Sequence, residues 1–167
     1  LWGSATMRTA GEEFAMALHL AGLSPKWDEG SARVSGFEVL PLALLGRPRI
    51  DLTLRVSGLF RDVFPTLAQL FEAGAEALSQ REESAEDNPY TIRTSRVFGP
   101  KPGLYGLGMG IAADTFTDEA RAAAGEAWLN ASSWSIGPDG QSTENRAELE
   151  QRVLSSEAFV HAQDLPE

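Results

Sequence analysis

The most constraining feature of the sequence is a change of hydrophobic period between residues 50 and 79. Apolar and polar residues alternate over 50–56, which is typical of a strand with unlike faces. From residue 63 the apolar residues recur at helical spacing, at Phe64, Leu67, Ala68, Phe71, Ala75 and Leu78. A strand followed directly by an amphipathic helix is the building unit of α/β folds.

Similar elements flank this pair. A helix is predicted from Thr9, which forms a Thr-x-x-Glu capping box with Glu12, to a stop at Gly22 and Pro25, and its buried stripe comprises Phe14, Ala17, Leu18 and Ala21. Residues 32–40 predict a strand, 117–129 and 143–157 predict helices, and 158–164 predict a short closing strand or extended segment. We therefore expect an α/β fold of Rossmann-like parallel-sheet units with helices on the faces.

The segments also suggest an organisation of the chain. Residues 1–87 would form one or more α/β sheet units, and residues 88–167 a glycine-rich loop plus a helical segment that returns to the sheet. The chain begins with Leu1, and residues 1–3 look like the tail of a strand, so we expect a fragment whose sheet is incomplete at the N-terminus. The charged stretch 81–90 predicts an exposed loop. Residues 95–110, with five glycines and two prolines, are too irregular for a strand or helix and predict a packed functional loop.

Composition excludes several classes of protein. The net charge of −10 argues against nucleic-acid binding, which needs a basic surface. Residues 1–111 hold 11 Lys/Arg and 13 Asp/Glu, net −2, whereas 112–167 hold 3 and 11, net −8, so an anionic ligand is expected near the arginines of the first part. The absence of cysteine excludes disulfides and thiolate chemistry and is compatible with a cytoplasmic protein. No apolar run predicts a membrane span.

The stretch "SGLFRDVFP", residues 57–65, joins the predicted strand to its helix and has two interpretations. In the structural one, Gly58 makes a turn, Asp62 caps a helix that starts at Val63, Pro65 lies in the first turn, and Arg61 makes a surface ion pair. In the functional one, Arg61 holds an anionic substrate group at the C-terminal end of a strand.

Two other features could carry chemistry. The glycines of the 103–110 run do not follow the dinucleotide or P-loop patterns, so a close-packed glycine loop is favoured over nucleotide binding, although such a loop can approach a flat ligand closely. His19 is predicted to be structural or at the surface. His161, which precedes Asp164 near the predicted closing strand, is a candidate ligand-binding residue because ligands bind at strand ends in α/β sheets.

The order of four segments resembles the large subunit of aerobic cobaltochelatase, which is related to the large subunit of magnesium chelatase. These segments are "LWGSATMRTAGEEFAMALHLAGLSPKWD", "GFEVLPLALLGRPRIDLTLRVSGLFRDVFPTLAQLFEAGAEAL", "RVFGPKPGLYGLGMG" and "FVHAQDLPE". The resemblance implies an internal part of a multidomain subunit that binds a tetrapyrrole, hydrogenobyrinic acid a,c-diamide, and receives Co²⁺ as the substrate metal. It also implies two AAA+-like ATPase partner subunits that hydrolyse ATP with Mg²⁺, in keeping with the missing P-loop.

Within this resemblance, metal insertion requires removal of inner ring protons by a carboxylate or histidine and binding of peripheral carboxylates by arginine. The predicted catalytic residues are His161, Asp164 and Asp62, with His161 the best candidate metal ligand. The predicted substrate-binding residues are Arg61, Arg8, Glu12, Gly103, Gly106 and Gly108. The segment "WLNASSWSIGPDG" departs from the family pattern, so Trp134 receives no role. The alternatives are a magnesium chelatase large-subunit-like protein or a structural docking segment without ligand contact.

Overall fold

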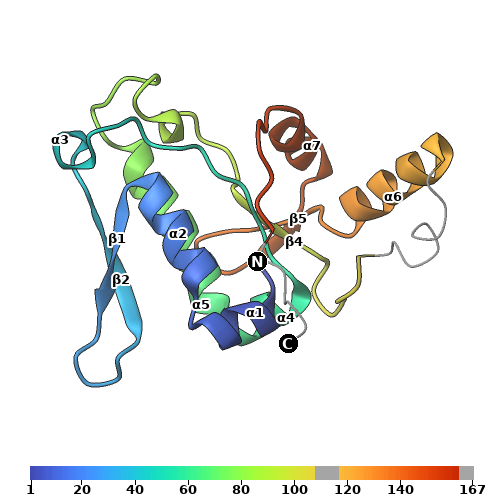
Figure 1. Cartoon of the computed structure of the whole chain (residues 1–167), viewed down its shortest axis with the longest axis horizontal. Coiled ribbons are helices and arrows are strands. Elements are labelled where there is room, and N and C mark those ends of the chain that lie inside the picture. Colours follow the sequence, from blue (N-terminus) through green and yellow to red (C-terminus); the bar gives the residue numbers. More distant parts are fainter. Residues whose placement is uncertain (108–116, 162–167) are drawn as a thin grey trace.

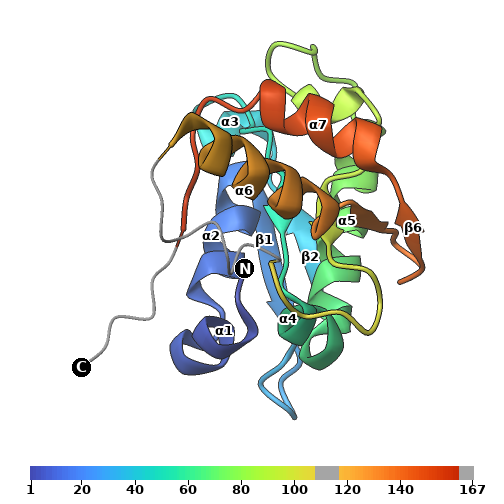
Figure 2. The ribbon, with the colours of Figure 1, turned by 90° about the vertical axis from the view of Figure 1, so that its right-hand side faces the viewer.

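The computed structural model describes residues 1–107 and 117–161 and shows helices packed around a small central sheet (Figure 1). The two views place α6 and α7 on one side of the molecule and α2 and α5 on the other (Figure 2). The helices are α1 (Gly3–Thr9), α2 (Glu12–Ala21), α3 (Leu42–Leu45), α4 (Gly58–Val63), α5 (Pro65–Ser79), η1 (Pro89–Thr91), α6 (Asp118–Asn130) and α7 (Arg146–Leu154). The strands are β1 (Leu23–Trp27), β2 (Val34–Val39), β3 (Leu54–Arg55), β4 (Val97–Gly99), β5 (Trp134–Ile136) and β6 (Ser142–Glu144).

The central sheet has the order β3-β4-β5-β6 and is mixed. Strands β3 and β4 are parallel, with Leu54 opposite Val97, and the other two pairs are antiparallel. The predicted α/β class is therefore confirmed, and the parallel pairing lies where α4 and α5 connect β3 to β4. The β5–β6 pair is antiparallel because a tight turn joins the two strands, in which Gly140 adopts the left-handed conformation at φ 78°.

The predicted strand tail at the N-terminus is reduced to one residue. The Leu1 backbone nitrogen donates to Arg55 O at 2.5 Å, and the Ser57 N–H donates to Leu1 O at 2.9 Å, which is the pattern of a parallel neighbour. Gly3 already begins α1, a helix that the sequence patterns did not predict. The Thr9 hydroxyl accepts from the Glu12 N–H at 3.3 Å, but the predicted capping box is wrong, because Thr9 is the last residue of α1 and Gly11 is the N-cap of α2.

The hydrophobic core lies between α2, α5 and the central sheet. The predicted stripe of α2 is buried, and α5 contributes Ala68, Phe71, Ala75 and Leu78 from the stripe predicted for it. Strands β3 and β4 add Leu54, Val97 and Phe98. Burial of these apolar surfaces supplies most of the stabilisation, at roughly 25 cal/mol per Å² removed from water.

Helix α2 ends at Ala21 with Gly22 as its left-handed cap, so the predicted stop is confirmed. Pro25 lies beyond it in β1 of an antiparallel β1–β2 hairpin, where an edge position tolerates its missing N–H. Three local predictions were wrong. Only Leu54 and Arg55 of the predicted strand 50–56 join the sheet. Residues 97–99 of the predicted glycine-rich loop form β4, an interior strand of the sheet. The segment 81–90 is exposed only in part, because Asn88 and Tyr90 are fully buried.

Three further predictions can be compared directly. Helix α6 begins after Thr117, whose hydroxyl accepts from the Ala120 N–H at 3.2 Å, as its sequence predicted. Residues 158–161 are exposed and take no part in the sheet. Among the described residues, none of the helices is both long and apolar enough to cross a membrane.

Candidate functional site

A cavity of about 700 Å³ lies between α2, residues 50–55, α7 and the segment 155–161. Its walls are mainly apolar and include Leu1, Trp2, Met16, Leu20, Leu149 and Val153. Two further residues complete the wall: Leu107 from the glycine-rich loop and Trp128 from α6. Residues from both ends of the described chain, Leu1 and His161, therefore line the same cavity. The volume of this cavity is within the range found for sites that bind small molecules.

Trp2 and His161 contact each other on the cavity wall. The Trp2 indole Nε1–H donates to His161 Nδ1 at 3.2 Å, and the rings meet edge to face with centroids 5.9 Å apart. Because Nδ1 accepts this bond, the neutral imidazole carries its hydrogen on Nε2. His161 therefore presents a donor on Nε2 in this arrangement, and it could bind a metal through Nε2 only as the other tautomer, which carries its hydrogen on Nδ1 and breaks the Trp2 bond.

Arg55 provides a cation beside Trp2. Its Nε–H donates to Ser132 Oγ at 3.0 Å, its Nη2–H donates to Ala131 O at 3.3 Å, and its guanidinium carbon lies 6.0 Å from the centre of the Trp2 ring. Burial lowers the pKa of Arg55 to about 10, since desolvation disfavours the charged form. The side chain remains protonated at neutral pH, so the wall carries a positive charge.

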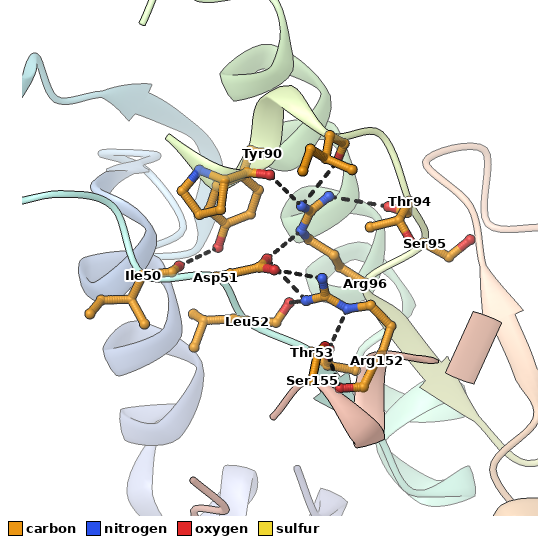
Figure 3. A network of polar contacts seen from close by, with 12 residues as sticks. Ile50, Asp51, Leu52, Thr53, Tyr90, Thr94, Ser95, Arg96, Arg152 and Ser155 are labelled. Atoms are coloured by element: carbon orange, nitrogen blue, oxygen red, sulfur yellow. Dashed lines mark hydrogen bonds and ion pairs between the residues drawn. The ribbon is translucent and has the colours of Figure 1, made fainter. Parts of the chain in front are cut away.

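An ion-pair network closes the cavity on the side of α7 (Figure 3). Asp51 accepts from Arg96 Nε at 2.9 Å and from both Nη atoms of Arg152 at 2.6 and 3.0 Å. Arg152 also donates to the Thr53 hydroxyl at 2.8 Å and to Leu52 O at 2.9 Å. Burial alone would raise the pKa of Asp51, but the hydrogen bonds and charges of the two arginines outweigh it and leave that pKa below its ordinary value.

A second polar cluster joins α4 to the loop 100–107. Arg61 is buried, and its Nη1 donates to Pro100 O at 2.8 Å and Lys101 O at 3.1 Å, while its Nε donates to Asp62 Oδ1 at 2.7 Å. Its Nη2 is buried without a hydrogen-bond partner in the part of the chain that the structure describes. The surface position that the structural interpretation predicted for Arg61 is wrong.

Asp62 completes this cluster rather than capping a helix. Its Oδ2 accepts from the Tyr105 hydroxyl at 2.5 Å. The hydrogen bonds from Arg61 and Tyr105 lower the pKa of Asp62, and the same bond to Asp62 raises the pKa of Tyr105. The predicted cap at Val63 is wrong because a helix already begins at Gly58, and the Ser57 hydroxyl caps it by accepting from the Phe60 N–H at 3.1 Å.

Gly58 allows the loop to approach α4. A Cβ at this position would lie 2.6 Å from Leu104 O and 2.8 Å from Tyr105 Cδ1, which is closer than non-bonded atoms come. The expectation that Gly58 makes a turn is therefore replaced by a packing role, because the residue is the first of α4. Pro65 occupies the first turn of α5, as predicted.

The comparisons with known proteins cover the whole chain. The family model described as CobN/Magnesium Chelatase matches residues 1–167. The chain belongs to this family. Within it, the chain is 40% identical to the aerobic cobaltochelatase subunit CobN of Pseudomonas aeruginosa over 98% of this chain, and 32% identical to a magnesium-chelatase subunit of Rhodobacter capsulatus over 93%.

A solved structure of a cobaltochelatase subunit has the same fold. The catalytic subunit of cobaltochelatase from Mycobacterium tuberculosis matches 91% of this chain with a TM-score of 0.81 and 33% identity. The chain spans about 15% of the Pseudomonas relative and about 14% of the Mycobacterium chain. The resemblance found in the order of the sequence segments is thus confirmed.

The predicted site residues of this family member fall in several places. His161 lines the cavity, whereas Arg61 and Asp62 form the cluster at α4. Arg8 and Glu12 are exposed on α1 and at the start of α2, and neither is among the residues that line the cavity.

The glycine-rich loop and the C-terminal segment complete this placement. Gly103 is exposed and left-handed at φ 86°, and Gly106 is exposed on the same loop. Gly108 and Asp164 lie outside the described residues. The described residues include no group of three or more His, Asp or Glu side chains placed to hold one metal ion.

Sequence reasoning missed several residues of the cavity wall. Trp2 and Arg55 were not predicted, although the alternation over 50–56 places Arg55 on the polar face of its strand. Asp51 and Arg152 were missed because they lie 101 residues apart and only the fold brings them together. Glu13 was also missed, although it lies on the same helical face as Ala17 and Leu20.

Proposed function

We propose that this chain is part of the tetrapyrrole- and metal-binding subunit of an ATP-dependent cobaltochelatase that inserts Co²⁺ into hydrogenobyrinic acid a,c-diamide in cobalamin biosynthesis. In this proposal two AAA+-like partner subunits hydrolyse ATP with Mg²⁺, and this chain contributes to the site of insertion. Membership of the family and the names of its relatives support the reaction class. The higher identity to CobN, 40% against 32% for the magnesium-chelatase relative, favours cobalt over magnesium.

The observation that carries the proposal is the cavity between α2 and α7. Its apolar walls suit the flat faces of a macrocycle, and Trp2 offers a ring against which such a face can stack. Arg55, whose hydrogen-bond acceptors among the described residues include no carboxylate, places positive charge at its polar wall, which suits the peripheral carboxylates of the diamide. Co²⁺ is a substrate in this reaction, so an exchangeable N/O environment serves better than a tight thiolate cage, and the sequence contains no cysteine.

The Arg61 cluster is proposed as a second contact for the anionic periphery of the macrocycle. Arg61 Nη2 is buried and unpartnered among the described residues, so an incoming carboxylate would satisfy it. The segment 100–107 would then respond to the ligand, because the same guanidinium holds the carbonyl oxygens of Pro100 and Lys101.

The experiment is a titration of the full-length large subunit with hydrogenobyrinic acid a,c-diamide, followed by the absorbance of the tetrapyrrole. Arg61→Ala and His161→Ala are each expected to raise the Kd about tenfold, corresponding to about 1.4 kcal/mol. Arg33→Ala, an exposed arginine in the β1–β2 hairpin, is the matched control. Wild-type affinity in both site variants would remove both residues from the binding role.

The same titration tests the two alternatives. A magnesium chelatase-like subunit would bind a porphyrin in preference to the corrin diamide. A docking segment would leave tetrapyrrole affinity unchanged in every cavity variant while weakening assembly with the ATPase subunits. Size-exclusion chromatography of the mixed subunits separates this last result from a loss of ligand binding.

A further inference from the structure

One charged group on the wall of the cavity lacks a hydrogen-bond partner. Both carboxylate oxygens of Glu13 are buried, and neither has a partner in the described part of the chain. The other ionised residues of the wall differ in this respect. Asp51 and Arg152 pair with each other, Arg55 donates to Ser132 and Ala131, and Glu157 is exposed to solvent.

The position of Glu13 follows from the period of α2. Glu13, Met16, Ala17 and Leu20 all line the cavity and are spaced at i, i+3, i+4 and i+7, which defines one face of a helix. The other three residues of this face are apolar. Of the two glutamates of α2, Glu13 lines the cavity and Glu12 does not. The Glu13 carboxylate therefore lies on a helix face that is otherwise apolar.

Such an arrangement disfavours folding unless a ligand compensates for it. A carboxylate removed from water without a hydrogen-bond donor loses its solvation, and the attraction of the Leu1 ammonium for Glu13 does not replace the missing hydrogen bonds. Glutamine or leucine at this position would avoid that cost and preserve the packing of α2. Groups of this kind occur where a bound ligand supplies the missing partner.

We infer that the Glu13 carboxylate is a catalytic group of this cavity, which accepts a proton from a ring nitrogen of the bound tetrapyrrole during metal insertion. This inference rests on the proposed function. In the step, a ring N–H bond breaks and its electron pair stays on nitrogen, where it becomes available to Co²⁺. An O–H bond forms on Glu13, and the neutral acid then returns the proton to water.

The surrounding groups agree with this role. Nearby apolar side chains limit access of water to Glu13, so a ring N–H is the donor that a bound macrocycle would present to it. The cations of the wall are already bonded to other groups: Arg55 donates to Ser132, Arg152 to Asp51, and the Leu1 ammonium, which attracts Glu13 electrostatically, to Arg55 O. His161, which presents its Nε2 hydrogen while Nδ1 accepts from Trp2, acts as a donor in this arrangement and leaves the acceptor role to Glu13.

The test compares Glu13→Gln with wild type in the full-length large subunit, alone and assembled with its ATPase partners. Glutamine keeps the size of the side chain and removes its basicity. We expect the Kd for the diamide to stay within about threefold, the rate of Co²⁺ insertion at saturating ligand to fall about 100-fold or more, and the Tm of the ligand-free subunit to stay equal or rise. Glu29→Gln, an exposed glutamate of the β1–β2 hairpin, is the control.

Each outcome decides the inference. A wild-type insertion rate in Glu13→Gln overturns it while leaving the proposed function intact, provided that wild type binds the diamide. A fall in the Tm of ligand-free Glu13→Gln would mean that the carboxylate stabilises the fold, which also overturns it. Failure of wild type to bind any tetrapyrrole would instead overturn the proposed function, and with it this role of Glu13.

Discussion

Two buried arginines, Arg96 and Arg61, differ in how completely their hydrogen bonds are satisfied. Arg96 is 2% exposed, and its three guanidinium nitrogens donate to Asp51, Thr94, Pro89 and Ile92, while its guanidinium carbon lies 4.3 Å from the centre of the Tyr90 ring. Arg61 is also largely buried, yet its Nη2 has no partner among the described residues.

This difference separates a network whose hydrogen bonds are complete from side chains whose hydrogen bonds are incomplete among the described residues. The Asp51–Arg96–Arg152 network is saturated by the chain itself, so it fixes the positions of β3, β4 and α7. Arg61 in the cluster at α4 and Glu13 on the cavity wall each leave polar atoms buried and unpartnered in the described chain, and a bound molecule could satisfy them.

The largest expected effect comes from breaking the saturated network. Arg96→Met removes every bond of the buried guanidinium and leaves Asp51 and three carbonyl oxygens without this donor. We expect the free energy of local opening to fall by about 3–5 kcal/mol, as for other buried pairs that lose one partner. Hydrogen exchange of peptides from β3 and β4 in the full-length subunit measures this free energy of local opening. A loss below about 1 kcal/mol would mean that the network does not hold these strands together.

The next effect concerns the approach of the loop to α4. Gly58→Ala places a methyl group against Leu104 O and the Tyr105 ring, so the loop 100–107 must move away from Arg61. We expect a cost of about 1–3 kcal/mol, typical of overpacking, with faster hydrogen exchange in residues 100–107 and little change in β4. Unchanged exchange in that loop would contradict the tight packing that makes this glycine necessary.

A smaller effect depends on pH through Asp51. Its pKa in the folded protein is lowered, so its stabilisation is complete above the unfolded value of about 4 and is lost as the pH falls through the folded value. We expect protonation of Asp51 to lower the free energy of unfolding by less than about 1 kcal/mol, because the carboxylate is 35% exposed and solvent screens its charge. Thermal unfolding of wild type and Asp51→Asn between about pH 3 and 6 tests this. Equal pH dependence in both proteins would exclude Asp51 as the source.

The smallest effect is expected at an exposed ion pair. Arg121 contacts Asp118 at 3.3 Å on α6, and the two side chains are 70% and 94% exposed. Such pairs contribute little, since water already solvates both charges. Arg121→Ala should therefore leave thermal unfolding and the Kd for the tetrapyrrole unchanged. A clear shift in either would show that this exposed ion pair contributes to stability or binding.

The helices could be predicted from the sequence to a large extent because their signals are local. The stripes of α2 and α5 and the Thr117 cap are each contained within one segment. Strands β4 and β5 are three residues long and show no period, and β4 is followed directly by Pro100. Their pairing depends on contacts such as Leu54 with Val97, which no local pattern encodes.

The candidate site was predicted less completely for a related reason. Sequence patterns directed attention to Arg61 and His161, but they placed Asp62 as a cap because the break between α4 and α5 at Phe64 gave no recognised signal. Ser57, three residues before Phe60, was the available signal for the true cap. Glu13 was not predicted because the sequence does not show whether a side chain is buried without a hydrogen-bond partner; only the folded structure shows it.

The contact between Asp51 and Arg152 also sets an order of events during synthesis. The two residues are separated by 101 positions, so at about 5–20 residues per second Arg152 is made roughly 5–20 s after Asp51. Until then the nascent chain lacks the wall formed by Leu149 and Val153, and the apolar side chains of α2 and residues 50–54 face water. A ribosome that pauses before α7 would therefore display an open apolar hollow, the kind of surface that chaperones bind.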